Sequence, residues 1–111
     1  MGAFTAGQVV LVRFPFSDLT ASKLRPAIVL AEAGRGDWIL CQITSKSYGD
    51  AKAVSLDTSD FARGSLRLAS YARPGKLFTA HGSLVANPVG ELQPGKFFAV
   101  RDAVVRMIQQ G

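Results

Sequence analysis

The sequence predicts a mainly β (α+β) fold: a small, strongly curved antiparallel sheet or half-open barrel of about five to seven strands, followed by a C-terminal helix. Short apolar runs recur along the chain and are separated by turns that contain Gly, Pro, Ser or Asp. The last segment, 94–110, changes to three- and four-residue spacing of its apolar residues. A length of 111 residues with 48% hydrophobic residues suits one domain over 1–111.

The first strand is expected in the run QVVLVRFPF, which is apolar except for Arg13 and stops at Pro15. The following residues 17–24, SDLTASKL, are polar and show no periodicity, which predicts an exposed loop that runs into Arg25. Exposed polar loops often carry binding residues. We therefore expect a ligand to be held where this loop meets the next strand.

Arg25 and Thr44 are the main candidate functional residues. Pro26 cannot donate a ladder hydrogen bond, so we place it at the start of the second strand, 27–30. The third strand begins at Trp38 and ends on Thr44. Antiparallel pairing of these strands places Arg25 and Thr44 at the same edge of the sheet. A guanidinium and a hydroxyl at one edge suit an oxyanion, most simply a phosphate.

The rest of the chain predicts further short strands and the helix. Residues 51–56 alternate as a fourth strand, and residues 57–66 predict one short helical turn. Residues 66–80, around ARPG, supply one or two strands, and 82–92 another. The helix over 94–110 has about four turns. Its predicted apolar face consists of Phe97, Val100, Val104 and Ile108, widened by Phe98, Val105 and Met107.

Composition narrows the classes of function. The 13 Lys and Arg residues against 8 Asp and Glu residues give a net charge of +5, which favours anionic partners such as nucleic acid or an acidic protein. One cysteine, Cys41, and one histidine, His81, cannot form a zinc site, and no phosphate-binding glycine loop is present. We expect no cofactor and no metal. The lack of a signal peptide, of a membrane-spanning run and of paired cysteines predicts a cytoplasmic protein.

Cationic, hydroxyl and aromatic side chains are expected around the edge that carries Arg25 and Thr44. Cations that contact phosphates, beside aromatic rings that stack on unpaired bases, suit single-stranded nucleic acid, and a solvated charged face is the alternative. His81 is interpreted as structural or exposed, and no serine has the partners of a catalytic triad. The candidate nucleic-acid-binding residues are Lys23, Ser45, Lys46, Tyr48, Arg67 and Arg73, with Tyr71 among them.

The stretch GQVVLVRFPFSDLTASKLRPAIVL, with the later strand that ends LCQITSKS, resembles the start of the MazF/PemK family of toxins from bacterial type II toxin-antitoxin systems. SLRLASYARPGKLFTAHGSLV and the terminal helix match the second half of the family in order and spacing. The resemblance runs from about Gly7 to the end. Its most specific parts are the RP pair before the second strand and the IT(S) that closes the third.

The resemblance implies an SH3-like barrel, a homodimer and a metal-independent endoribonuclease that cuts single-stranded RNA. Arg25 matches the catalytic arginine of the family and Thr44 its catalytic threonine. The implied chemistry uses the 2′-hydroxyl of the RNA as nucleophile and leaves a 2′,3′-cyclic phosphate and a 5′-hydroxyl. The residues support these roles, since a guanidinium stabilises the charge that gathers on a phosphorane. An acidic cognate antitoxin would cover the same basic groove with a disordered segment.

Three positions depart from the family pattern. Gln8 stands where many members have aspartate, Leu24 where some have histidine, and Ala69 where some have an acidic residue that is proposed as a base. The general base is therefore unidentified, and the predicted loop offers only Asp18. Two alternatives stay open: a non-catalytic SH3-like module that binds RNA or protein, and a toxin that poisons DNA gyrase.

Overall fold

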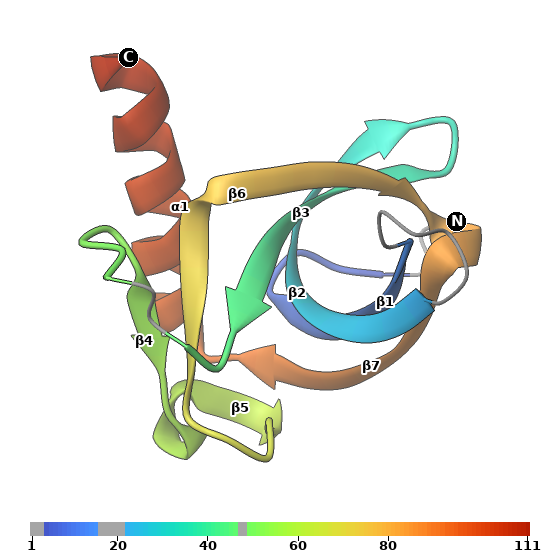
Figure 1. The fold of residues 1–111 in the computed structure, drawn as a ribbon, viewed down its shortest axis with the longest axis horizontal. Coiled ribbons are helices and arrows are strands. Elements are labelled where there is room, and N and C mark those ends of the chain that lie inside the picture. The colour runs from blue at the N-terminus through green and yellow to red at the C-terminus, as the bar shows by residue number, and fades with distance from the viewer. Residues whose placement is uncertain (1–3, 16–21, 47–48) are drawn as a thin grey trace.

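The protein is a curved antiparallel half-barrel with a helix packed against one side (Figure 1). The computed structural model describes residues 4–15, 22–46 and 49–111, and the side chains of 4–13, 24–46 and 49–111. The described residues form seven strands, which are hydrogen-bonded in the order β4-β6-β3-β2-β1-β7-β5. This confirms the predicted fold class. The elements are β1 (Gln8–Pro15), β2 (Ser22–Gly34), β3 (Asp37–Thr44), β4 (Val54–Leu56), the 3-10 helix η1 (Thr58–Asp60), β5 (Phe61–Gly64), β6 (Ser70–His81), the 3-10 helix η2 (Gly82–Leu84), β7 (Val85–Leu92) and α1 (Pro94–Gln110).

Both faces of the central strands are buried, which explains why the apolar runs are continuous rather than alternating. Val9 of β1 lies in a core cluster with Phe97 and Val100 of α1. Its neighbour Val10 points to the other face and lies in a second cluster with Trp38. Because the sheet curls around one cluster and carries α1 over the other, each central strand must be apolar on both sides.

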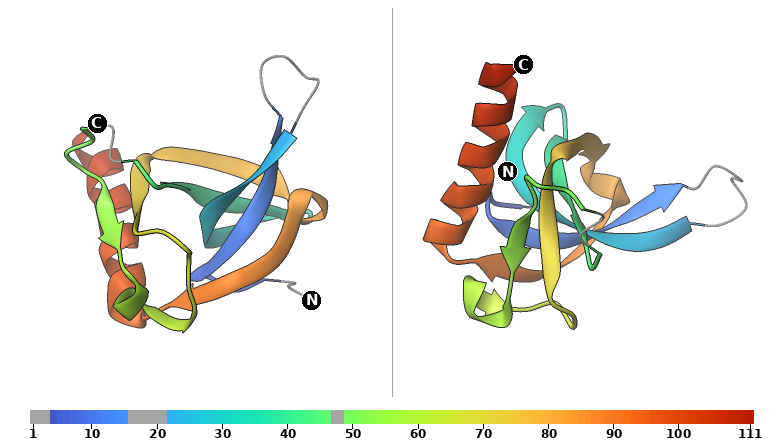
Figure 2. Two further views of the ribbon diagram at one scale, coloured as in Figure 1. Left: turned by 60° about the horizontal axis from the view of Figure 1, so that its bottom comes forward. Right: turned by 60° about the vertical axis from the view of Figure 1, so that its left-hand side comes forward.

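The strand β2 begins at Ser22, so the last part of the predicted loop 17–24 is strand and that prediction was wrong there. Its first residues pair with the end of β1, and this pair of strand ends projects from the barrel (Figure 2). The ladder therefore extends beyond the apolar run of β2, whose polar first residues did not predict a strand. The remainder of the loop, with Asp18, lies outside the described residues.

Pro26 lies within β2, opposite Leu11 of β1, and not at the start of the strand as predicted. The described ladder between β2 and β3 begins one residue later, at Ala27. Pro26 is thus paired with β1 on one side. On its other side, it lies beyond the end of the ladder between β2 and β3. A proline is tolerated in a strand where its missing N–H is not needed by a neighbour.

The strand β6 is one strand with a sharp bend, which resolves the one or two strands expected around ARPG. Leu77 is paired with Cys41 of β3, but Ala72 is paired with Ile43, so the register shifts within the residues between them. Pro74 and Gly75 occupy this shift. The bend lies beside α1 in Figure 1.

Residues 57–66 form the expected helical turn, η1, and then the strand β5, which was not predicted. Within η1, the Asp60 carboxylate accepts a hydrogen bond from the backbone N–H of Asp57 at 2.8 Å. Gly64 ends β5 with φ +61°, and a Cβ there would collide with the backbone oxygen of Val89 in β7. The close approach of β5 to β7 therefore requires glycine at this position.

The helix α1 spans the predicted range, but its packed face is shorter than predicted. Ile108 is 69% exposed, because the last turns extend past β6 (Figure 1). Phe98 and Val105, which were expected to widen the packed face, are exposed as well. Among the described residues, no helix has the length and apolar character needed to span a membrane. The buried residues of α1 are Phe97, Val100 and Val104.

Candidate functional site

A pocket of about 590 Å³ opens where the end of β3 meets β2 and the connection between β5 and β6. It lies between elements that are distant in the order of the sheet, because the sheet curls until its two ends approach each other. The residues that line it are Leu11, Leu24, Arg25, Pro26, Ile43, Thr44, Ser45, Lys46, Ser65, Leu66, Arg67, Leu68, Ser70 and Val89.

Arg25 and Thr44 both line this pocket, from neighbouring strands. The described ladder between β2 and β3 ends at the pair Ala27 and Gln42. Arg25 lies two residues before Ala27, and Thr44 lies two residues after Gln42. Because the strands are antiparallel, Arg25 and Thr44 both lie just beyond this last pair, at the same edge of the sheet, as the sequence predicted.

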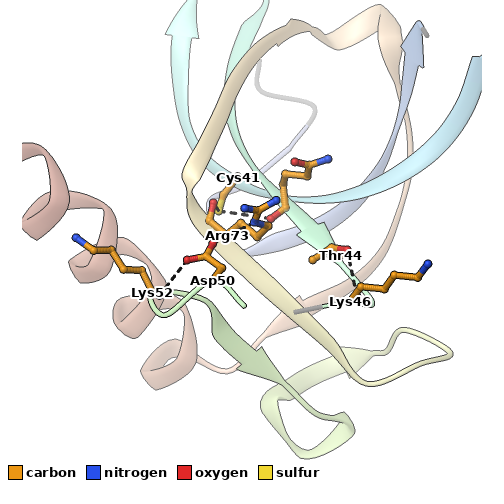
Figure 3. Close-up of polar contacts among 7 residues, drawn as sticks. Cys41, Thr44, Lys46, Asp50, Lys52 and Arg73 are labelled. Carbon is orange, nitrogen blue, oxygen red and sulfur yellow. Dashed lines mark hydrogen bonds and ion pairs between the residues drawn. The ribbon is translucent and has the colours of Figure 1, made fainter. Parts of the chain in front are cut away.

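The hydroxyl of Thr44 is oriented by the backbone that follows it. Its Oγ1 accepts a hydrogen bond from the backbone N–H of Lys46 at 3.1 Å (Figure 3). A threonine hydroxyl has one proton to donate, and accepting this bond leaves that proton available. The half-buried Thr44 can therefore donate to an anion in the pocket.

The charge of the pocket is positive. Among the lining residues that the structure describes, the charged ones are Arg25, Lys46 and Arg67, and all three are cationic. Arg67 comes from the connection between β5 and β6, whereas Lys46 directly follows Thr44 and Ser45. Three cations around one concave surface raise the local concentration of anions.

The rest of the pocket wall is aliphatic. Leu24 and Leu68 are 46% and 65% exposed, which is unusual for large apolar side chains unless the surface contacts another molecule. Leu66 and Val89 line the same pocket. The hydroxyl of Ser70 donates to the carbonyl oxygen of Leu68 at 2.9 Å and so shapes this segment. The pocket thus offers cations and hydroxyls for a charged group beside an apolar wall for a flat or apolar one.

The structure brings together only some of the residues predicted for nucleic-acid binding. Ser45, Lys46 and Arg67 line the pocket together with Arg25 and Thr44. Arg73 does not line it: its Nε lies 3.0 Å from Asp50 Oδ2 in an ion pair. Tyr48 and the side chain of Lys23 lie outside the described residues.

Sequence reasoning missed the wall formed by Ser65, Leu66 and Leu68, and it missed Asp50. No local signal marks the wall, because it reaches the pocket only through the closure of the barrel. Asp50 stands in a turn-rich connection where an aspartate is ordinary. Only its contact with Arg73 distinguishes it.

The cysteine and the histidine of the chain, Cys41 and His81, both have structural roles. Burial raises the pKa of the Cys41 thiol to about 12, so the thiol is neutral at physiological pH. The Nδ1 of His81 accepts from the backbone N–H of Ser83 at 3.1 Å and caps η2, in line with its interpretation as a structural residue. Within the described part of the chain, no three His, Cys, Asp or Glu side chains are grouped as metal ligands.

Residues 5–108 match the model of a family described as the PemK-like, MazF-like toxin of type II toxin-antitoxin systems. The chain belongs to this toxin family. The match spans every residue that lines the pocket of this MazF-like toxin. A search of curated protein sequences gave no match.

Solved structures similar to this MazF-like toxin share its fold over nearly the whole chain. A MazE-MazF complex from Deinococcus radiodurans (form II) has a TM-score of 0.79 and 18% identity, covering 100% of both chains. An endoribonuclease in complex with its cognate antitoxin, from a mycobacterial species, has a TM-score of 0.73 and 16% identity, covering 98% of this chain and 96% of the other. MazF from Deinococcus radiodurans (form I) has a TM-score of 0.72 and 22% identity, covering 94% of each chain.

Proposed function

We propose that this MazF-like toxin is an endoribonuclease that cuts single-stranded RNA without a metal ion. The single observation that carries the proposal is that Arg25 and Thr44 line one cationic pocket. One of the similar structures is itself an endoribonuclease bound to its antitoxin, which supports the same activity here.

The reaction is a transesterification within the RNA. The 2′-oxygen attacks the adjacent phosphorus, the bond from phosphorus to the 5′-oxygen breaks, and a 2′,3′-cyclic phosphate and a 5′-hydroxyl result. The 2′-hydroxyl loses a proton and the leaving 5′-oxygen gains one. Negative charge builds up on the non-bridging oxygens of the phosphorane. The Arg25 guanidinium, with several donors in a fixed plane, stabilises that charge.

Thr44 holds the scissile phosphate in place by donating the proton that its bond with Lys46 leaves available. Lys46 and Arg67 bind phosphates that flank the scissile one, and Ser45 adds a hydroxyl contact. The aliphatic wall around Leu68 accommodates a base. An unpaired base can enter such a pocket, whereas a base inside a duplex cannot, so the substrate is single-stranded.

Among the described residues that line the pocket, none is a carboxylate or an imidazole. We assign no general base to these residues. Arg25 and Thr44 then supply the catalysis by electrostatic stabilisation and orientation.

The partner of this toxin is an acidic antitoxin in the cytoplasm. Structures with the same fold are complexes with MazE or with a cognate antitoxin. The positive pocket suits acidic side chains as well as phosphates, so one surface serves both ligands. A small acidic open reading frame beside the gene, whose product abolishes RNA cleavage when mixed with the toxin, would support this assignment.

A homodimer is the expected assembly. The outer face of α1 exposes Phe98, Val105 and Ile108, and apolar side chains grouped on one helix face favour association. Sedimentation at micromolar concentration should give a dimer, and Ile108→Glu should weaken it. A monomer for the wild type would contradict this assignment.

The test of the proposed activity is to incubate the protein with a long single-stranded RNA in EDTA and to map the ends. We expect defined fragments with 2′,3′-cyclic phosphate and 5′-hydroxyl ends. An RNA with 2′-deoxy sugars at the mapped positions should not be cut there, because the nucleophile is missing. Arg25→Ala should lower kcat by about 100-fold or more.

The matched control is Arg106→Ala, which removes an exposed arginine on α1 outside the pocket. It should cut RNA at the wild-type rate. Intact RNA with the wild-type protein, or equal cleavage by wild type and Arg25→Ala, would refute the enzyme assignment. RNA binding without cleavage would instead indicate a non-catalytic module, and loss of gyrase supercoiling activity would indicate a gyrase poison.

A further inference from the structure

The bend of β6 carries an ion pair that sits close to the pocket without lining it. Arg73 is located at this bend, directly after Ala72, which is paired with Ile43 of β3. The next residue of β3 is Thr44, which is paired with Tyr71. Arg73 thus belongs to the stretch of β6 that supports the end of β3.

Arg73 is held from two sides. Its Nε donates to Asp50 Oδ2 at 3.0 Å, and the side chains of Arg73 and Asp50 are only 22% and 19% exposed. Its backbone oxygen accepts a hydrogen bond from the buried thiol of Cys41 at 3.3 Å. Figure 3 shows Arg73 between Cys41 and Asp50.

Asp50 is fixed in turn by the connection that leads from β3 to β4. Its Oδ1 accepts from the backbone N–H of Lys52 at 3.0 Å, and its backbone oxygen accepts from the N–H of Ala53 at 3.1 Å. The same connection begins with Ser45 and Lys46, which line the pocket. The ion pair therefore ties the chain that leaves Thr44 to the strand that is paired with Thr44.

We propose that the Asp50–Arg73 ion pair is a positioning device, which holds Thr44 and Lys46 in the geometry needed for RNA cleavage. Arg73 then acts through the backbone and does not bind RNA itself. This inference rests on the proposed function for its kinetic consequence, but its structural consequence can be measured without any activity.

The positions of Asp50 and Arg73 explain how the ion pair can affect Thr44. Thr44 Oγ1 can accept from the Lys46 N–H only while residues 44–46 keep their shape at the end of β3. Arg73 directly follows Tyr71 and Ala72, which are paired with Thr44 and Ile43, and its ion pair with the partly exposed Asp50 fixes this part of β6. A small displacement of Thr44 would misplace the donor that orients the phosphate, and misplacement by about 1 Å can cost 100-fold in rate.

The kinetic experiment compares wild type, Asp50→Asn and Arg73→Lys on one single-stranded RNA. Asp50→Asn keeps the size of the side chain and an acceptor oxygen but removes the charge. We expect kcat to fall by about 10- to 100-fold, with KM changed by less than about threefold, because substrate contacts remain. Arg73→Lys keeps the charge and tests the proposal should Asp50→Asn fold poorly. Asp102→Asn, an exposed aspartate of α1 with the same chemical change, should leave kcat unchanged.

If the ion pair only stabilised the fold, the variants would have a lower melting temperature but an unchanged kcat at a temperature where all of them are folded. A direct RNA contact by Arg73 would instead raise KM and lower the salt dependence of binding. Either result would overturn the positioning role. In a double-variant cycle, the Asp50→Asn/Arg73→Gln double variant is compared with its two single variants. Its loss of kcat should be no larger than that of the worse single variant, because the pair acts as a unit.

The second measurement does not depend on cleavage. Hydrogen exchange of the Lys46 amide, followed by NMR, reports its bond with Thr44 Oγ1. We expect exchange at least about threefold faster in Asp50→Asn than in wild type or Asp102→Asn. Unchanged exchange would refute the positioning role even if the protein cuts RNA. Failure of the wild type to cut RNA would refute the proposed function alone, and the exchange rates would still decide this inference.

Discussion

Thr44 and Lys46 are joined by a local hydrogen bond in which the Thr44 hydroxyl oxygen is the acceptor, with 3.1 Å between Oγ1 and the Lys46 nitrogen. The bond directs the hydroxyl of Thr44 relative to the pocket that both residues line. The backbone N–H of Lys46 therefore decides how the Thr44 hydroxyl at the end of β3 can donate its proton.

The first prediction separates the hydroxyl of Thr44 from its shape. Thr44→Val keeps the branched side chain and removes the hydroxyl, so kcat for RNA cleavage should fall by about 100- to 1,000-fold, as for the loss of one transition-state donor. Thr44→Ser keeps the hydroxyl and should retain most of the activity. Initial rates under saturating RNA measure both. Equal losses in the two variants would mean that the methyl group, and not the hydroxyl, matters.

The second prediction concerns the cations of the pocket. Arg67→Ala and Lys46→Ala should each weaken the binding of a non-cleavable single-stranded oligonucleotide. Each should also reduce the slope of log K against log salt concentration by about 0.7, because one phosphate contact is lost. Fluorescence anisotropy over a salt series measures the slope. Arg106→Ala is the control, and a slope unchanged by the pocket variants would contradict their phosphate contacts.

The third prediction concerns Cys41. Because burial raises the pKa of its thiol to about 12, the folded protein should react very slowly with a thiol reagent at pH 8. Reaction should become complete after denaturation. Absorbance of the released reagent group follows both states. Rapid stoichiometric labelling of the folded protein would contradict the buried position of Cys41.

The fourth prediction concerns the glycine that ends β5 where β5 pairs with β7. Gly64→Ala adds a Cβ against the Val89 backbone oxygen at a residue with φ +61°, so it should lower the free energy of unfolding by more than about 1 kcal/mol. Gly95→Ala is a suitable control, because nothing lies within 4 Å of an added Cβ at Gly95. Urea denaturation measures both. An unchanged midpoint for Gly64→Ala would show that β5 can move away from β7 without cost.

The fifth prediction concerns pH. The Lys52 backbone N–H and the Arg73 guanidinium hold the pKa of Asp50 below its usual value. A carboxyl whose pKa is lowered on folding contributes stability above its unfolded pKa of about 3.9, and this contribution is lost as the pH falls through the lowered folded value. Wild type should therefore be more stable than Asp50→Asn at pH 5 to 7, and the difference should shrink below about pH 4. A difference that is constant from pH 7 to pH 2, in urea unfolding at each pH, would contradict the charge interaction.

The candidate site was predicted in part from local sequence. Arg25 and Thr44 were recognisable because each stands at the end of an apolar run, and antiparallel pairing of two adjacent runs leaves few other arrangements. The start of β2 was misplaced, since its first residues are held by backbone pairing with β1, which needs no apolar side chains. Arg73 was grouped with the phosphate ligands because a basic residue near the site looks the same in sequence whether it faces the pocket or an aspartate.

By itself, the sequence determined the elements whose signals are local: the periodic helix α1, the apolar cores of the central strands, and the proximity of Arg25 to Thr44. Only the tertiary structure decided that Ser65, Leu66 and Leu68 form a wall of the same pocket and that Asp50 binds Arg73. The physical reason is that these contacts arise when the two ends of the sheet close on each other and β6 bends. Closure and bending depend on the summed packing of both faces of the sheet, which no short stretch of residues specifies.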